Sequence, residues 1–121
     1  MYIEQIREYC LSKKGTTESF PFDKDTLVFK VLNKMFVIAP LGKWESGEAS
    51  ITLKCDPIYT VELREQYESV YPGPYVSNIH WNTIAIYKGE LQPKFILELI
   101  SHSYDMVFKG MSKKLRDSLL Q

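Results

Sequence analysis

The sequence has no excess of charge of either sign. Lys plus Arg and Asp plus Glu number 15 each in 121 residues, and the balance holds in both halves of the chain. A basic tail that binds nucleic acid through net charge is therefore excluded, and any such binding must come from a patch that folding creates. No apolar run approaches the roughly 20 residues needed to span a bilayer, so we expect no membrane partner.

Cysteine is also scarce. Cys10 and Cys55 lie far apart and form no C-x-x-C pair. The first ten residues, MYIEQIREYC, lack the basic and apolar segments of a secretory signal. We therefore expect two reduced thiols in a cytoplasmic protein.

Recognisable catalytic motifs are absent. The chain contains no G-x-S-x-G, P-loop, G-x-G-x-x-G or H-E-x-x-H sequence and only two histidines. Residue type alone would allow a metal site built from Cys55, His80 and His102, but no local spacing supports one. We expect no enzymatic activity, no cofactor and no metal.

Apolar periodicity and breaker residues predict one domain over residues 1–121. The expected elements are a helix over 2–14, strands over 27–32, 35–40 and 49–55, a helix over 57–68, a strand over 82–88, a helix from Pro93 to Gly110, and a short last helix capped by Ser112. Residues 16–25 are predicted to be a loop and residues 42–48 a turn. The order α-β-β-β-α-β-α-α predicts an α+β fold, in which helices flank a four-stranded antiparallel sheet.

One stretch carries no formal charge. It is YPGPYVSNIHWNTIAIY, residues 71–87, with His80 and Trp81 at its centre. In one interpretation Trp81 fills the core and His80 bonds a loop carbonyl, because aromatic side chains supply the most apolar area each. In the other, the stretch presents neutral hydrogen-bond donors beside an aromatic surface, which suits contact with phosphates or bases.

Two lysines lie at strand positions that alternate with apolar neighbours. Lys30 and Lys54 should therefore point away from the packed face of the sheet. If their strands pair, both lysines share the other face, and Lys43 could join them from the turn that follows the second strand.

Several segments, taken in order, resemble the MmcQ/YjbR-like family of small bacterial proteins. They are YCLSKKGTTESFPF, ITLKCDP, LREQYESVYPGPY, IHWNTI, LISHSYDMV and SKKLRDSL. The resemblance implies a fold similar to the bacterial frataxin homologue, and DNA binding through a "double wing" of two β-hairpins. The wings would lie around Asn33-Lys34 and over 43–48. Relatives commonly carry Asn-Lys just before the His-Trp pair, whereas this chain has Ser77-Asn78-Ile79, so a phosphate-binding lysine is missing.

Two hypotheses follow. The first is a DNA-binding module without catalysis, with double-stranded DNA as its partner and contacts from Lys30, Lys43, Lys54, Asn78 and His80. The second is a small-molecule or protein-interaction domain with a groove along the charge-free segment, lined by Tyr71, Tyr75, His80 and Trp81.

Overall fold

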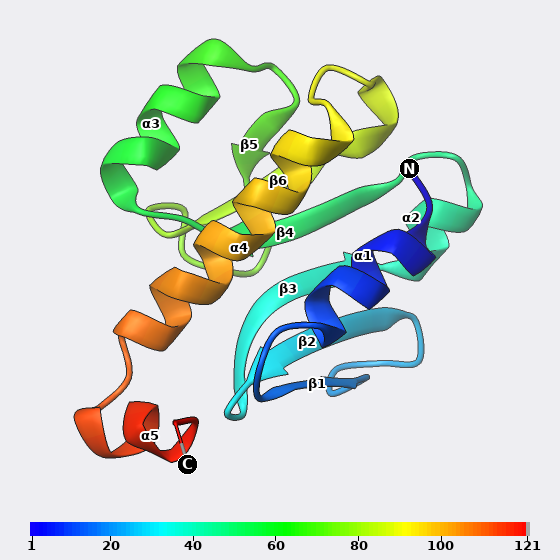
Figure 1. The fold of residues 1–121 in the computed structure, drawn as a ribbon. Coiled ribbons are helices and arrows are strands. Elements are labelled where there is room, and N and C mark those ends of the chain that lie inside the picture. Colours follow the sequence, from blue (N-terminus) through cyan, green and yellow to red (C-terminus); the bar gives the residue numbers. More distant parts are fainter. Residues whose placement is uncertain (121) are drawn as a thin grey trace.

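A computed structural model describes residues 1–120 and contains a mixed α+β fold (Figure 1). The helices are α1 (Ile3–Leu11), α2 (Leu41–Glu45), α3 (Pro57–Gln66), α4 (Pro93–Lys109) and α5 (Lys113–Ser118), with a 3₁₀ turn η1 (Ile86–Lys88). The strands are β1 (Thr16–Ser19), β2 (Thr26–Val31), β3 (Lys34–Pro40), β4 (Ser50–Lys54), β5 (Val70–Pro72) and β6 (Trp81–Ala85). The predicted helix starts at Asp56 and Ser112 are confirmed, because both side chains cap their helices.

The sheet has six strands in the order β1-β2-β3-β4-β6-β5, and every neighbouring pair is antiparallel. The predicted count of four strands was wrong, because both edge strands were missed. The β1 sequence Thr-Thr-Glu-Ser has no apolar alternation, and an edge strand needs none on its exposed side. The other edge strand, β5, is three residues long and ends in Pro72, which only an edge position tolerates well.

Two further segments differ from their predictions. Residues 41–45 form the short helix α2 instead of a turn. The last predicted strand ends at Ala85, and the next three residues make the 3₁₀ turn η1. Gly89 ends that turn with a left-handed φ of 69°, which glycine adopts without strain.

One face of the sheet is covered by α1 and α4, which lie side by side across it (Figure 1). Phe29, Val37 and Leu53 are paired along one row of this face and belong to the buried core. A register shift after Phe29 leaves Phe36 without a partner on β2, and its side chain is also fully buried. Such a bulge places two successive side chains of β3 in the core.

The opposite face is only partly open. Its central row contains Thr52 and Thr83, whose hydroxyl oxygens lie 2.8 Å apart and which are both buried. The connection from β5 to β6 passes over them, because a Cβ atom at Gly73 would lie 2.8 Å from Thr52 Cγ2. This connection, which is part of the charge-free segment, therefore crosses the face. Trp81 was expected to fill the core, but it is only half-buried and lies outside the core cluster.

Candidate functional site

The β2–β3 hairpin turns through Leu32 and Asn33, both with positive φ (47° and 70°). This pattern is typical of the two-residue turns that match the twist of paired strands. Asn tolerates it readily, whereas Leu adopts it rarely. The hairpin was predicted with a turn one residue later, at Asn33-Lys34. Because the turn comes earlier, Lys34 is the first residue of β3 and pairs with Val31.

Beside this turn is a cleft of about 430 Å³, which we call the lysine cleft. Its lining comes from the hairpin, from the facing ends of β4 and β6, and from the end of α4: Lys30, Asn33, Lys34, Met35, Lys54, Trp81, Val107 and Gly110. Strand register explains the arrangement, since Lys30 pairs with Met35 and Lys54 pairs with Trp81 on the face away from the core. The expectation that Lys30 and Lys54 share one face is therefore met.

The cleft exists because β3 and β4 separate towards this end of the sheet. The two strands pair only at Val37–Leu53 and Ile38–Thr52. Beyond those pairs, the buried Ser103 of α4 replaces the missing ladder. Its Oγ donates to the Phe36 carbonyl (2.6 Å) and accepts from the Lys54 amide (2.9 Å). Both backbone groups therefore keep a partner although the strands have parted.

The lysine cleft is cationic. Three of its eight lining residues are lysines, and none is an acid. Within residues 1–120 the ion pairs are Arg7–Glu18 and Lys113–Asp117, so the three cleft lysines are not neutralised by a bound carboxylate. Folding has thus separated a local positive patch from a chain whose net charge is zero.

The connection that carries Asn78 and His80 is held by Arg64 of α3. Arg64 Nε donates to Asn82 Oδ1 (2.7 Å), and Nη2 donates to the carbonyls of Asn78 (2.5 Å) and Trp81 (3.2 Å). The His80 carbonyl accepts from the Cys55 amide (2.8 Å), while its side chain is exposed. Arg64 positions Trp81, and no sequence motif pointed to it.

The five residues of the DNA-binding hypothesis are only partly brought together. Lys30 and Lys54 line the same cleft, and Asn78 and His80 are exposed in the chain segment that leads into Trp81. Lys43 lies on α2, which follows the far end of β3 from the hairpin turn (Figure 1). The lysine that joins the cleft in its place is Lys34.

A second hollow, of about 520 Å³, lies on the same face and is called the aromatic groove below. Its walls are two connections and its floor is β2 and β3; the lining is Phe22, Asp23, Thr26, Met35, Ile38, Pro74, Tyr75 and Val76. Of the four residues predicted to line a groove, Tyr75 lines this one and Trp81 lines the lysine cleft. Tyr71 and His80 line neither.

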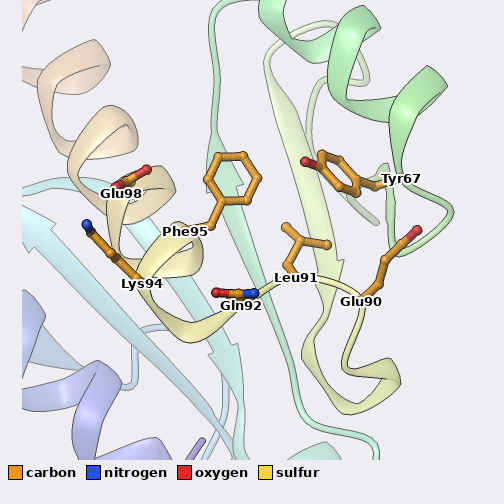
Figure 2. A pocket seen from close by; sticks show the side chains of 7 residues that line it. All are labelled: Tyr67, Glu90, Leu91, Gln92, Lys94, Phe95 and Glu98. Carbon is orange, nitrogen blue, oxygen red and sulfur yellow. The ribbon is translucent and has the colours of Figure 1, made fainter.

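A third hollow, of about 380 Å³, lies between the end of α3 and the start of α4 (Figure 2). Tyr67 and Phe95 both line this hollow, and the centroids of their rings lie 5.8 Å apart. Glu90 accepts from the Ser69 amide (2.8 Å), and this hydrogen bond lowers the pKa of the carboxyl group. Because the lining includes Lys94 as well as Glu90 and Glu98, the hollow has no single sign of charge to select a ligand.

The second histidine has a structural role. His102 Nε2 accepts from the Asp56 amide (3.1 Å), and its ring packs edge-on against Tyr59. Burial lowers the pKa of His102, so the neutral ring is favoured. Among residues 1–120, no group of three His, Cys, Asp or Glu side chains is arranged to hold a metal ion. In the same part of the chain, no helix has the length and apolar character required to cross a bilayer.

The chain is similar in sequence to known bacterial proteins. The sequence model of the YjbR family matches residues 11–106. The curated protein YjbR of Escherichia coli K12 is 26% identical over 121 residues, which is 100% of this chain and 99% of that protein. YbdF of Escherichia coli O157:H7 is 30% identical over 96 residues, covering 78% of this chain and 75% of YbdF.

Two crystal structures have similar folds. Protein DR2400 of Deinococcus radiodurans superposes with a TM-score of 0.87 at 32% identity, covering 98% of this chain and 87% of that one. A protein from Pseudomonas syringae gives a TM-score of 0.70 at 24% identity, covering 88% of this chain and 98% of its own. At that identity, the second likeness shows the fold alone.

Proposed function

This chain belongs to the YjbR family, and we propose that it is a cytoplasmic nucleic-acid-binding domain that holds backbone phosphates in the lysine cleft without catalysing a reaction. The observation that supports this is the grouping of Lys30, Lys34 and Lys54 in one cleft without an acidic neighbour in its lining. Trp81 and Asn33 add an aromatic ring and an amide to the same walls. Lysine, amide and aromatic groups are those that proteins commonly use for phosphate and base contact.

The attraction should be short in range. The net charge is zero, so a nucleic acid at a distance meets no overall positive field. At physiological salt the Debye length is about 8 Å, and only phosphates close to the cleft interact with its lysines. We therefore expect weak binding typical of non-specific complexes, with dissociation constants of about 10⁻⁴ to 10⁻⁶ M.

A double-wing mode would need a different pair of wings from the two suggested by the resemblance. The β2–β3 turn and the segment containing α2 lie at opposite ends of β3 (Figure 1). A DNA surface that contacts the β2–β3 turn would therefore lie the length of β3 away from the segment containing α2. We propose instead that the first hairpin works with the ends of β4 and β6, which meet it at the lysine cleft.

Fluorescence anisotropy with a labelled 20-mer, as single strand and as duplex, tests the proposal. Release of counterions gives a salt slope of about 0.7 to 0.9 per neutralised phosphate, so three lysine contacts predict a loss of about 20- to 40-fold in affinity between 50 and 200 mM salt. In Lys54→Ala, two contacts remain, and the loss should be about 7- to 12-fold.

The matched control is Lys43→Ala, which removes a lysine of the original hypothesis that lies outside the cleft. It should keep both the affinity and the salt slope of the parent. If Lys43→Ala and Lys54→Ala weaken binding equally, the cleft is not the contact surface. If the parent forms no complex with either form of DNA at 50 mM salt and 100 µM protein, the proposed function is wrong.

The aromatic groove favours a second candidate, a domain that binds a small apolar molecule or a protein segment. Phe22 and Tyr75 stand on its two walls, and Met35 and Ile38 contribute to its floor. Such binding would not depend on salt or on Lys54. Titration with a panel of uncharged aromatic compounds, followed by intrinsic fluorescence, would detect it. A saturable response that is unchanged in Lys54→Ala would favour this candidate.

A further inference from the structure

We infer that the nucleic acid bound by this domain is single-stranded, with bases stacked in the aromatic groove and phosphates held in the lysine cleft. This inference rests on the proposed function and adds a choice of strand form to it. In this inference one ligand occupies both hollows: the aromatic side chains of the aromatic groove contact its bases, and the lysine cleft contacts its phosphates.

The two hollows adjoin each other. Met35 lines both, and its partner across the hairpin, Lys30, belongs to the lysine cleft. A ligand that occupies both must therefore carry anionic and flat apolar parts within a short distance. A single strand has this alternation at every nucleotide, since each phosphate adjoins a base with a π-face.

The aromatic walls are already exposed to water. Phe22 is 61% exposed and Tyr75 is fully exposed, although a folded chain gains by burying such rings. Tyr75 also has a left-handed φ of 61°, a conformation that is uncommon for a bulky residue. Rings held outward in this way offer stacking surfaces, and stacking on an aromatic side chain contributes about 1–3 kcal/mol per base.

A charged group in the aromatic groove distinguishes it from the lysine cleft. Asp23 lies at the aromatic groove and accepts hydrogen bonds from the amides of Asp25 (2.9 Å) and Thr26 (2.7 Å). These bonds lower the pKa of Asp23, so its carboxylate stays ionised. The negative charge of Asp23 repels phosphates from the aromatic groove, whereas the lysines attract phosphates to the lysine cleft.

A duplex cannot use this arrangement. Its base faces are stacked inside the helix, so they are hidden from a ring on a protein surface unless a base is extruded. The groove floor also lies between two connections, those that carry Phe22 and Tyr75. A rigid duplex would rest on these connections, whereas unstacked bases can enter between them.

The experiment compares a labelled single-stranded oligothymidine 12-mer with a duplex of the same length at 50 mM salt. The parent protein should bind the single strand at least about tenfold more tightly than the duplex. Phe22→Ala and Tyr75→Ala should each weaken single-strand binding by about 5- to 150-fold, the equivalent of one lost stack, and leave duplex binding unchanged. Tyr75→Phe keeps the ring and should keep the affinity.

The control for the aromatic variants is Tyr87→Ala. Tyr87 is an exposed ring of the same charge-free segment, but it lines a separate hollow with Tyr2 and Trp44. It should not change binding. Because Phe22, Tyr75 and Tyr87 are all exposed, we expect these variants to fold, which circular dichroism checks.

Each alternative outcome separates the two proposals. Duplex binding as tight as single-strand binding would overturn this inference and leave the proposed function standing. Single-strand binding that does not respond to Phe22→Ala or Tyr75→Ala would overturn it as well. Failure to bind either form would remove the proposed function itself. Single-strand affinity that is unchanged in Lys54→Ala would show that the lysine cleft does not hold the phosphates of the strand, and it would overturn the inference.

Discussion

Removal of the Ser103 hydroxyl should be among the most damaging small changes in this fold. That hydroxyl is fully buried and serves two backbone groups, the Phe36 carbonyl and the Lys54 amide, where β3 and β4 part. Ser103→Ala removes the hydroxyl partner of both groups, and the bond to the Phe36 carbonyl lies in the buried interior. The substitution deletes one atom, so no steric change accompanies the loss.

The magnitude follows from these two groups. A buried backbone group that loses its only partner costs about 1–3 kcal/mol, and two such groups cost about 2–6 kcal/mol. Alanine regains about 0.5 kcal/mol through its higher helix propensity. We therefore expect the free energy of unfolding to fall by about 3 kcal/mol. A chain of 121 residues is stable by about 6–18 kcal/mol, so this loss is a large fraction of the total.

Urea denaturation of Ser103→Ala against Ser101→Ala measures the effect. Ser101 lies on the same helix and makes one part-buried bond, to the Tyr9 hydroxyl (2.5 Å), so its loss should cost only about 1 kcal/mol. With a slope of about 2 kcal/mol per molar urea, Ser103→Ala should lower the midpoint by about 1.5 M. Hydrogen exchange at the Lys54 amide should also become faster. If Ser103→Ala costs no more than Ser101→Ala, the proposed bridging role of Ser103 is wrong.

Two other predictions concern the start of α3. Burial lowers the pKa of His102 in the folded chain. Below a pH of about 6.5 the histidine therefore binds a proton more readily in the unfolded chain than in the folded one. The free energy of unfolding should fall as the pH drops from 7.5 to 5.5. His102→Gln keeps an acceptor for the Asp56 amide but cannot titrate, so its urea midpoint should fall less over that range; an equal fall would contradict the assignment. Asp56→Ala removes the cap on the Ile58 and Tyr59 amides and should cost about 1 kcal/mol by urea denaturation. Asp56→Asn, which keeps an accepting oxygen, should cost clearly less, and a similar loss in both variants would argue against the cap.

Local signals predicted most of the regular structure. Asp56 followed by Pro57 marked the start of α3, and Pro93 and Gly110 bounded α4. Alternation of apolar residues along β2 and β4 indicated which side chains face the core, and hence that Lys30 and Lys54 face away from it. These features depend on a few neighbouring residues, so the sequence carries them directly.

The edge strands and the site needed the whole fold. β1 and β5 form because β2 and β6 offer them hydrogen-bonding edges, a condition that no local pattern encodes. Likewise, Arg64 reaches Asn78 only because α3 packs beside the connection to β6. The alternation of apolar and polar residues along β2 and β4 could place Lys30 and Lys54 on one face of the sheet. It could not reveal that a cleft forms beside them.

By itself, the sequence determined the fold class, the faces of the central strands and the absence of net charge, because each is set by residue type and short-range order. Tertiary structure alone decided that Lys34 and not Lys43 joins Lys30 and Lys54, and that Trp81 stands beside them. The physical reason is long-range strand pairing, in which β3 and β4 part at a point that Ser103 bridges. As a result, the side chains of Lys30 and Lys54, which are 24 residues apart in the chain, come to line one cleft.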